Sequence, residues 1–251
     1  MSRSRLLIAI SMSAALAGLW SAGCTGYGTQ YGGGNPPSEE GATSSSNAPV
    51  PVGAAATPPF DLQKVIQRAH FAFRPEGAGF EGGHSTYQVN VSRRGEIAFT
   101  RWQRSHGDQG NTVSHSAAFM LETTQIERGG SSIAPAVAQG ADVEEDGTLA
   151  LQRGTVVERL HNEPRGLEQS WTFANRPAGE GGLTVHLKTG GMAYLGRTES
   201  DLRFLDRASN LGVRYGEAVW IDANGDRTPL AVGYTGGDVT VSRDELLLYN
   251  T

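Results

Sequence analysis

The sequence predicts an all-β protein: an antiparallel β-sandwich with one short N-terminal helix, preceded by a signal peptide and a disordered linker. From Tyr87 onward, apolar and polar residues alternate in many short segments, as they do in strands with one buried face. Turn signals such as Arg94-Gly95 and Asn224-Gly225 separate these segments at intervals of about 8–12 residues. The 34 glycines and 11 prolines among 251 residues also favour a chain rich in turns.

Residues 1–23 are predicted to be a secretory signal peptide. Two arginines near the start precede an apolar run from Leu6 to Trp20, and the small residues Ser21-Ala22-Gly23 follow. This arrangement is typical of a cleaved leader, and the run is too short for a comfortable membrane span. The next residue, Cys24, is the sole cysteine of the chain, so it has no partner for a disulfide.

The position of Cys24 resembles the lipobox of bacterial lipoproteins. This resemblance implies that the thiol receives a diacylglyceryl group and that Cys24 becomes the new N-terminus. Ser21 departs from the pattern, because lipoboxes usually carry Leu three positions before the cysteine. A soluble secreted protein is therefore the alternative.

The rest of the chain is predicted to consist of a tether, residues 24–59, and one β-sandwich domain, residues 60–251. From Thr25 to Pro59 the chain has no Leu, Ile, Phe or Trp, so it cannot bury enough apolar surface to offset the entropy of ordering it. From Phe60 the composition changes, and the remaining length suits a single core without disulfides.

The domain is predicted to open with a helix over Phe60–Ala69, where apolar residues recur at helical spacing after Asp61, a candidate cap. The strands follow from alternating apolar residues. These are Tyr87, Val89 and Val91; Ile97 and Phe99; Phe119 and Leu121; Leu149 and Leu151; Leu183, Val185 and Leu187; Val219 and Ile221; Val239 and Val241. The polar stretch Arg104–Ser116 is predicted to be an exposed loop.

That polar stretch carries His106, Asp108 and His115, which are weak candidates for a metal site. Zinc needs three or four rigidly held ligands, and a loop rich in Gly, Ser and Asn holds them poorly. Solvated histidines are therefore the favoured interpretation, and no metal or cofactor is predicted.

A second weak candidate is formed by Asp222, Asn224 and Asp226, which have the spacing that begins a calcium loop. Arg227 replaces the glycine of such a loop, and Gly233 stands where its bidentate Glu belongs. Asn224-Gly225 is instead a strong hairpin signal, so a hairpin is favoured.

Glu163 and Glu168 flank a Pro-Arg-Gly turn and resemble the paired carboxylates of a glycosidase only in composition. The sequence contains no G-x-S-x-G, H-E-x-x-H or phosphate-loop motif. The prediction is therefore that the protein is not an enzyme. The alternative is an envelope hydrolase acting on polysaccharide or peptide, in which these two carboxylates, His106, Asp108 or His115 converge on folding.

Trp102 and Trp220 are the predicted binding surface. Each alternates against the aliphatic residues of its strand, which would place it on the opposite, exposed face as a platform for a sugar ring or an apolar side chain. The alternative is that the helix or a loop covers them, or that both sheet faces are buried. Trp171 shares a face with Leu167 and Phe173 and is predicted to be core.

Four stretches carry a wider resemblance: His70–Arg74, Gly83–Tyr87, Val156–Phe173 and Leu211–Ala223. They make nearly all of residues 60–245 similar to the N-terminal β-domain of large secreted bacterial surface proteins, especially myxobacterial ones, that precedes FG-GAP or kelch-type repeats. The resemblance implies an all-β sandwich, no established activity and no catalytic residues. Members usually continue into the repeats, whereas this sequence ends at Leu246–Thr251.

Together these observations predict a lipid-anchored bacterial cell-envelope protein, an outer-membrane lipoprotein or else a secreted one. It would present a β-sandwich surface for adhesion, scaffolding or binding. The predicted partners are the membrane, through the lipid, and an envelope protein or a glycan. The net charge of −5 argues against a nucleic-acid partner.

Overall fold

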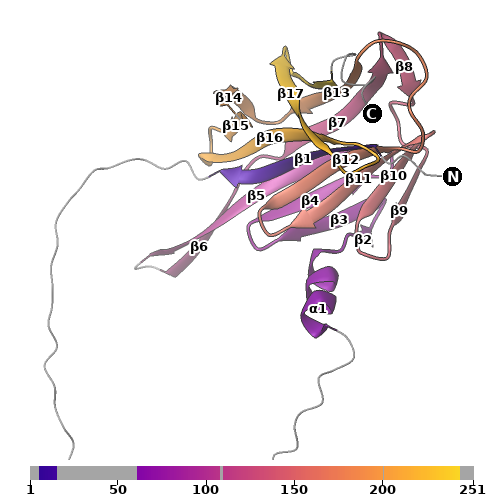
Figure 1. Cartoon of the computed structure of the whole chain (residues 1–251). Coiled ribbons are helices and arrows are strands. Elements are labelled where there is room, and N and C mark those ends of the chain that lie inside the picture. Colours follow the sequence, from indigo (N-terminus) through magenta and orange to yellow (C-terminus); the bar gives the residue numbers. More distant parts are fainter. Residues whose placement is uncertain (1–5, 16–60, 108–109, 200, 244–251) are drawn as a thin grey trace, which may run out of the picture. The chain divides into compact units, whose positions relative to one another are not determined.

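Alternating apolar residues build two antiparallel sheets that share one core (Figure 1). The computed structural model describes residues 6–15, 61–107, 110–199 and 201–243. The elements below belong to one unit, formed by Met1–Ala17 and Gln63–Thr251. This arrangement confirms the predicted antiparallel, sandwich-like all-β fold.

Sheet A contains eight strands, each antiparallel to its neighbours. In spatial order they are β9 (Gly140–Val143), β10 (Leu149–Arg153), β11 (Val156–Glu163), β12 (Gly166–Phe173), β1 (Leu6–Ala15), β16 (Leu211–Ile221), β15 (Asp201–Asp206) and β14 (Ala193–Arg197).

Sheet B is also antiparallel. In spatial order its strands are β2 (Arg74–Glu76), β3 (Gly79–His84), β4 (Tyr87–Ser92), β5 (Glu96–Gly107), β7 (Phe119–Arg128), β13 (Leu183–Gly190), β18 (Asp238–Arg243) and β17 (Arg227–Thr235). The short β8 (Ser131–Ala134) pairs with β7, and β6 (Gly110–His115) pairs with the outer half of β5.

The core lies between the sheets and confirms the predicted alternation. In β4 the side chains of Tyr87 and Val89 are fully buried, and Gln88 between them is more exposed. Trp171 of sheet A is 0% exposed, as predicted. Each fully buried large apolar side chain contributes about 1.5–3 kcal/mol, so this shared interior is the main stabilising feature of the fold.

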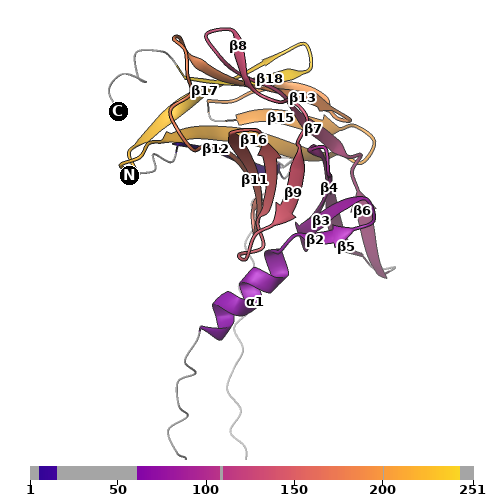
Figure 2. The same cartoon turned by 90° about the vertical axis from the view of Figure 1, so that its right-hand side faces the viewer.

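Strand β17 joins the two sheets. Its first part, Arg227–Leu230, pairs with β16 of sheet A, and its second part, Ala231–Thr235, pairs with β18 of sheet B. Figure 2 shows β17 and β18 above β16 in the same view. The backbone hydrogen bonds of one strand therefore hold the sheets together at this edge.

The predicted helix is present as α1, Leu62–Phe71, two residues further along than Phe60–Ala69. Its apolar residues Val65 and Ile66 are 49% and 59% exposed. The helical spacing is thus confirmed, but among the described residues no element covers this apolar face.

The prediction of a loop over Arg104–Ser116 is wrong. The outer half of β5 and β6 form a regular hairpin, in which Trp102 pairs with His115 and His106 pairs with Asn111. The described residues of β6 are all exposed. Period-two alternation reveals a strand only when one face is buried, so a hairpin solvated on both faces resembles a loop in sequence.

The expectation that Trp220 is exposed is also wrong, because a β-bulge reverses the alternation within β16. The consecutive β1 residues Ser11 and Ile10 pair with Gly216 and Ala218 of β16. Glu217 between them has no partner on β1 and adopts a φ of 31°. Beyond the bulge Trp220 faces the core at 1% exposure, and the guanidinium of Arg243 lies 4.2 Å from its ring centroid.

Strand β1 lies within the segment predicted to be the signal peptide. It pairs with both β12 and β16, and in Figure 1 it is the indigo strand between them. Cys24 and the predicted tether, 24–59, lie outside the described residues. Within the described part of the chain, no helix has the length and apolar content that a membrane crossing needs.

Candidate binding cleft

A cleft of about 470 Å³ lies where α1 leads into the first strands of sheet B. Figure 2 shows α1 next to β2 and β3. Its lining residues come from the end of α1, from β2, β3 and β4, and from the middle of β5. They are His70, Ala72, Arg74, Glu76, Glu81, Gly82, Gly83, His84, Tyr87, Gln88 and Trp102. The cleft therefore brings together residues that are up to 32 positions apart, from His70 to Trp102.

Two adjacent glycines of β3 line this cleft. A Cβ on Gly82 would lie 2.9 Å from the ring of Phe73, and one on Gly83 would lie 2.5 Å from the backbone oxygen of Tyr87. Gly83 also has a φ of 148°, which side chains rarely adopt. The end of β3 thus contributes backbone to the cleft where any other residue would contribute a side chain.

Aromatic rings line one side of the cleft. The rings of Phe71 and His84 stack at 5.4 Å, and His70 meets His84 edge-on at the same distance. Tyr87 is fully buried, and its hydroxyl donates to the backbone oxygens of Glu163 and Gly166, at 2.8 and 2.7 Å. Burial raises the pKa of Tyr87, so this phenol keeps its proton and ties the cleft to the β11–β12 turn of sheet A.

Trp102 completes the cleft at the point where β5 leaves its pairing with β4. Its backbone N–H donates to the oxygen of Thr86 at 2.9 Å, and its ring lies 5.5 Å from that of His115. The side chain is half-buried. Of the two tryptophans predicted to form a binding surface, Trp102 is therefore partly accessible and Trp220 is not.

The polar groups of the cleft carry both signs of charge. Gln88 Nε2 donates to Glu81 Oε2 at 2.9 Å, and Arg74 Nη2 donates to the backbone oxygen of Ala69 at 3.0 Å. Burial, and next the charge of His70, lowers the pKa of His84, so His84 is neutral at pH 7. The cleft therefore offers both hydrogen-bond donors and acceptors. Its charged side chains carry opposite signs, so they do not produce an electrostatic potential of one sign.

His106 and His115, the two candidate metal ligands of the β5–β6 hairpin that the structure describes, lie apart. His106 and His115 are four residues apart along the hairpin ladder, which corresponds to about 13 Å. Asp108 lies outside the described residues. In the described part of the chain, no group of three or more His, Cys, Asp or Glu is placed to hold a metal ion.

The favoured hairpin at Asp222–Asp226 is confirmed. Asp222 Oδ1 accepts hydrogen bonds from the backbone N–H groups of Asn224 and Asp226, at 2.8 and 2.9 Å. Gly225, with a φ of 89°, supplies the turn. Oδ1 of Asp222 is therefore engaged by the turn itself.

Glu163 and Glu168 belong to the β11–β12 hairpin and do not line the cleft. Glu168 lies opposite His161 in the ladder. Burial, and next the charge of Glu163, raises the pKa of Glu168. His106 and His115 belong to the β5–β6 hairpin, so the proposed hydrolase residues are divided between two hairpins.

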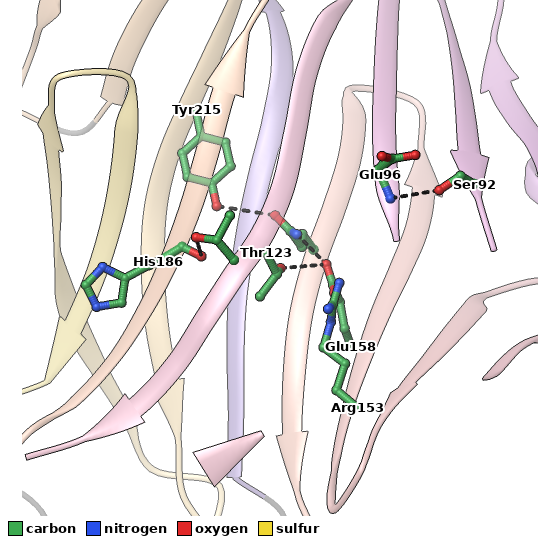
Figure 3. Close-up of polar contacts among 9 residues, drawn as sticks. Ser92, Glu96, Thr123, Arg153, Glu158, His186 and Tyr215 are labelled. Carbon is green, nitrogen blue, oxygen red and sulfur yellow. Dashed lines mark hydrogen bonds and ion pairs between the residues drawn. The ribbon is translucent and has the colours of Figure 1, made fainter. Parts of the chain in front are cut away.

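The sequence did not single out a second polar cluster, which lies inside the core (Figure 3). The Glu158 carboxylate accepts from Arg153 Nε at 2.6 Å, and both side chains are 0% exposed. Burial, and next the charge of Glu158, raises the pKa of Tyr215 at the far end of the cluster. One signal was available: Glu158 takes an inward position between Val156 and Leu160 in an alternating strand.

Comparisons of the chain with protein-family models, with curated protein sequences and with solved structures found no match.

Proposed function

We propose that the protein is a lipid-anchored bacterial cell-envelope protein whose β-sandwich binds a glycan in the cleft at Trp102. The observation that carries the proposal is the half-buried Trp102 ring beside hydrogen-bonding side chains of both charges. A sugar ring has an apolar C–H face, which suits an aromatic ring, and a rim of hydroxyls that donate and accept.

The dimensions and charges of the cleft favour this ligand class. A volume of about 470 Å³ suits one or two sugar units, because small-molecule sites span about 300–1,000 Å³. Glu76 and Glu81 accept from hydroxyls, Arg74 donates to them, and Gln88 can do both. The mixed charge favours a neutral polyhydroxylated ligand over a polyanion.

The anchoring part of the proposal rests on the sequence of residues 1–24. Two or more acyl chains on Cys24 would hold the protein firmly at a membrane, and the tether would let the domain reach a nearby polysaccharide. The same processing would remove β1 from sheet A, because Leu6–Ala15 precede Cys24.

Binding is tested by titrating the full chain with oligosaccharides from bacterial envelope polysaccharides and following tryptophan fluorescence. We expect Trp102→Ala to weaken binding by about tenfold or more, which is the loss of about 1.4 kcal/mol from a stacked ring. Leu195→Ala is the matched control, because Leu195 is 54% exposed on β14 and does not line the cleft. Equal binding by wild type and the Trp102 variant would contradict the proposal.

Anchoring is tested separately by growing cells with radiolabelled palmitate. The label should enter the wild-type protein and be absent from a Cys24→Ala variant. A protein without label, released to the medium, would support the soluble secreted alternative.

A further inference from the structure

A nucleophile, a base and an electrophile lie together in the dry interior between the sheets (Figure 3). The Thr123 hydroxyl of β7 donates to Glu158 Oε1 at 3.1 Å. The Gln169 side-chain amide of β12 donates to the same oxygen at 2.6 Å. All three residues are 0% exposed.

Two further side chains complete the arrangement. The Arg153 guanidinium is the counter-ion of the Glu158 carboxylate, at 2.6 Å. The Tyr215 hydroxyl donates to the Gln169 carbonyl oxygen, Oε1, at 3.3 Å. The Thr123 hydroxyl is thus hydrogen-bonded to a carboxylate base, and the Gln169 carbonyl oxygen to a donor, which are the groups that acyl transfer requires.

We propose that Thr123 and Gln169 form an intramolecular ester that joins sheet B to sheet A. Thr123 Oγ1 attacks Gln169 Cδ, so the Oγ1–Cδ bond forms and the Cδ–Nε2 bond breaks. The hydroxyl proton passes through the Glu158 carboxylate to the departing nitrogen, which leaves as ammonia. The reaction involves no change of oxidation state and no further reactant.

The shared carboxylate oxygen places the two reacting side chains side by side. Thr123 Oγ1 and Gln169 Nε2 donate to Glu158 Oε1 at 3.1 and 2.6 Å. Attack requires Oγ1 to come within about 3–3.5 Å of Cδ, so the reaction needs a rotation about the side-chain bonds of Gln169. The Tyr215 hydroxyl stabilises negative charge on the amide oxygen as it develops.

The surroundings also protect the product. Water would hydrolyse an ester, and a fully buried site excludes it. Ammonia escapes to solvent, and its dilution makes the reverse reaction slow. This inference does not depend on the proposed glycan binding.

The test is the intact mass of the purified full chain under denaturing conditions. Ester formation makes the chain lighter than its sequence by one ammonia, about 17 Da. Proteolysis should yield one branched peptide containing Thr123 and Gln169, and hydroxylamine should cleave it.

Two neighbouring threonines give a matched pair of variants. Thr123→Val removes the nucleophile and should restore the full mass. Thr124→Val should keep the loss, because Thr124 Oγ1 donates to the backbone oxygen of His186 and not to Glu158. A wild-type chain of full mass, or a loss that persists in Thr123→Val, would overturn the proposal.

Discussion

The cleft at Trp102 and the cluster around Glu158 are both built from polar and aromatic side chains, yet they differ in access to water. At the cleft, Glu81 and Arg74 are exposed and engage only local groups. In the core, the Glu158 carboxylate is buried and accepts three hydrogen bonds. Polar groups at a rim can exchange water for a ligand, whereas those in a dry interior are fixed by one another.

Removing one side of the buried ion pair should be among the changes with the largest effect on stability. Arg153→Met leaves the Glu158 charge buried without its counter-ion and should lower the free energy of unfolding by about 3–5 kcal/mol in a urea titration. The double variant Arg153→Met/Glu158→Leu removes both charges and should be more stable than the single variant. A double variant less stable than Arg153→Met would contradict this interpretation of the core.

Trp220 and Trp102 should differ in how much they stabilise the fold, because Trp220 lies in the core and Trp102 at the edge of the cleft. Trp220→Ala empties a fully buried site and should cost about 3–5 kcal/mol. Trp102→Ala should cost markedly less, because its side chain is only half-buried. Thermal unfolding of the two variants side by side measures the difference, and equal losses would mean that Trp102 is a core residue.

Two glycines with similar backbone angles test how tightly the buried cluster is packed. Gly95 has a φ of 96°, and a Cβ there would lie 2.5 Å from Arg153 Nη2. Gly225 has a φ of 89° and nothing within 4 Å of its Cβ position. Gly225→Ala should cost about 1 kcal/mol from backbone strain alone, and Gly95→Ala should cost about 1–3 kcal/mol more. Urea unfolding at equal protein concentration compares them.

The smallest effect is expected from the pH dependence of the cleft. The pKa of His84 lies below its ordinary value of 6.5, so below pH 6.5 the unfolded chain binds a proton at this residue before the folded chain does. Stability should therefore be full above pH 6.5, fall as the pH drops below it, and level off once the folded His84 is also protonated. His84→Gln should flatten that part of the pH profile, and an unchanged profile in this variant would contradict the interpretation.

The strands that pack one face on the core could be predicted, because burial imposes a period of two on residues such as Tyr87 and Val89. Trp220 could not be placed, since a single bulge at Glu217 reverses the alternation without any mark in composition. The cleft depends on contacts between residues distant in sequence, and only Trp102 was singled out in advance. His84 was passed over because a half-buried histidine has no periodic signature.

If the chain is exported and cleaved as proposed, strand β1 makes the order of cleavage and folding matter. Because it is antiparallel to both β12 and β16, those two strands run parallel to each other on either side of it. Cleavage before Cys24 would free this strand from the rest of the chain. If folding came first, the severed piece would stay held by backbone hydrogen bonds along both edges. If cleavage came first, the amide groups of β12 and β16 that face β1 would exchange their hydrogens with solvent, which deuterium exchange on the processed protein would reveal.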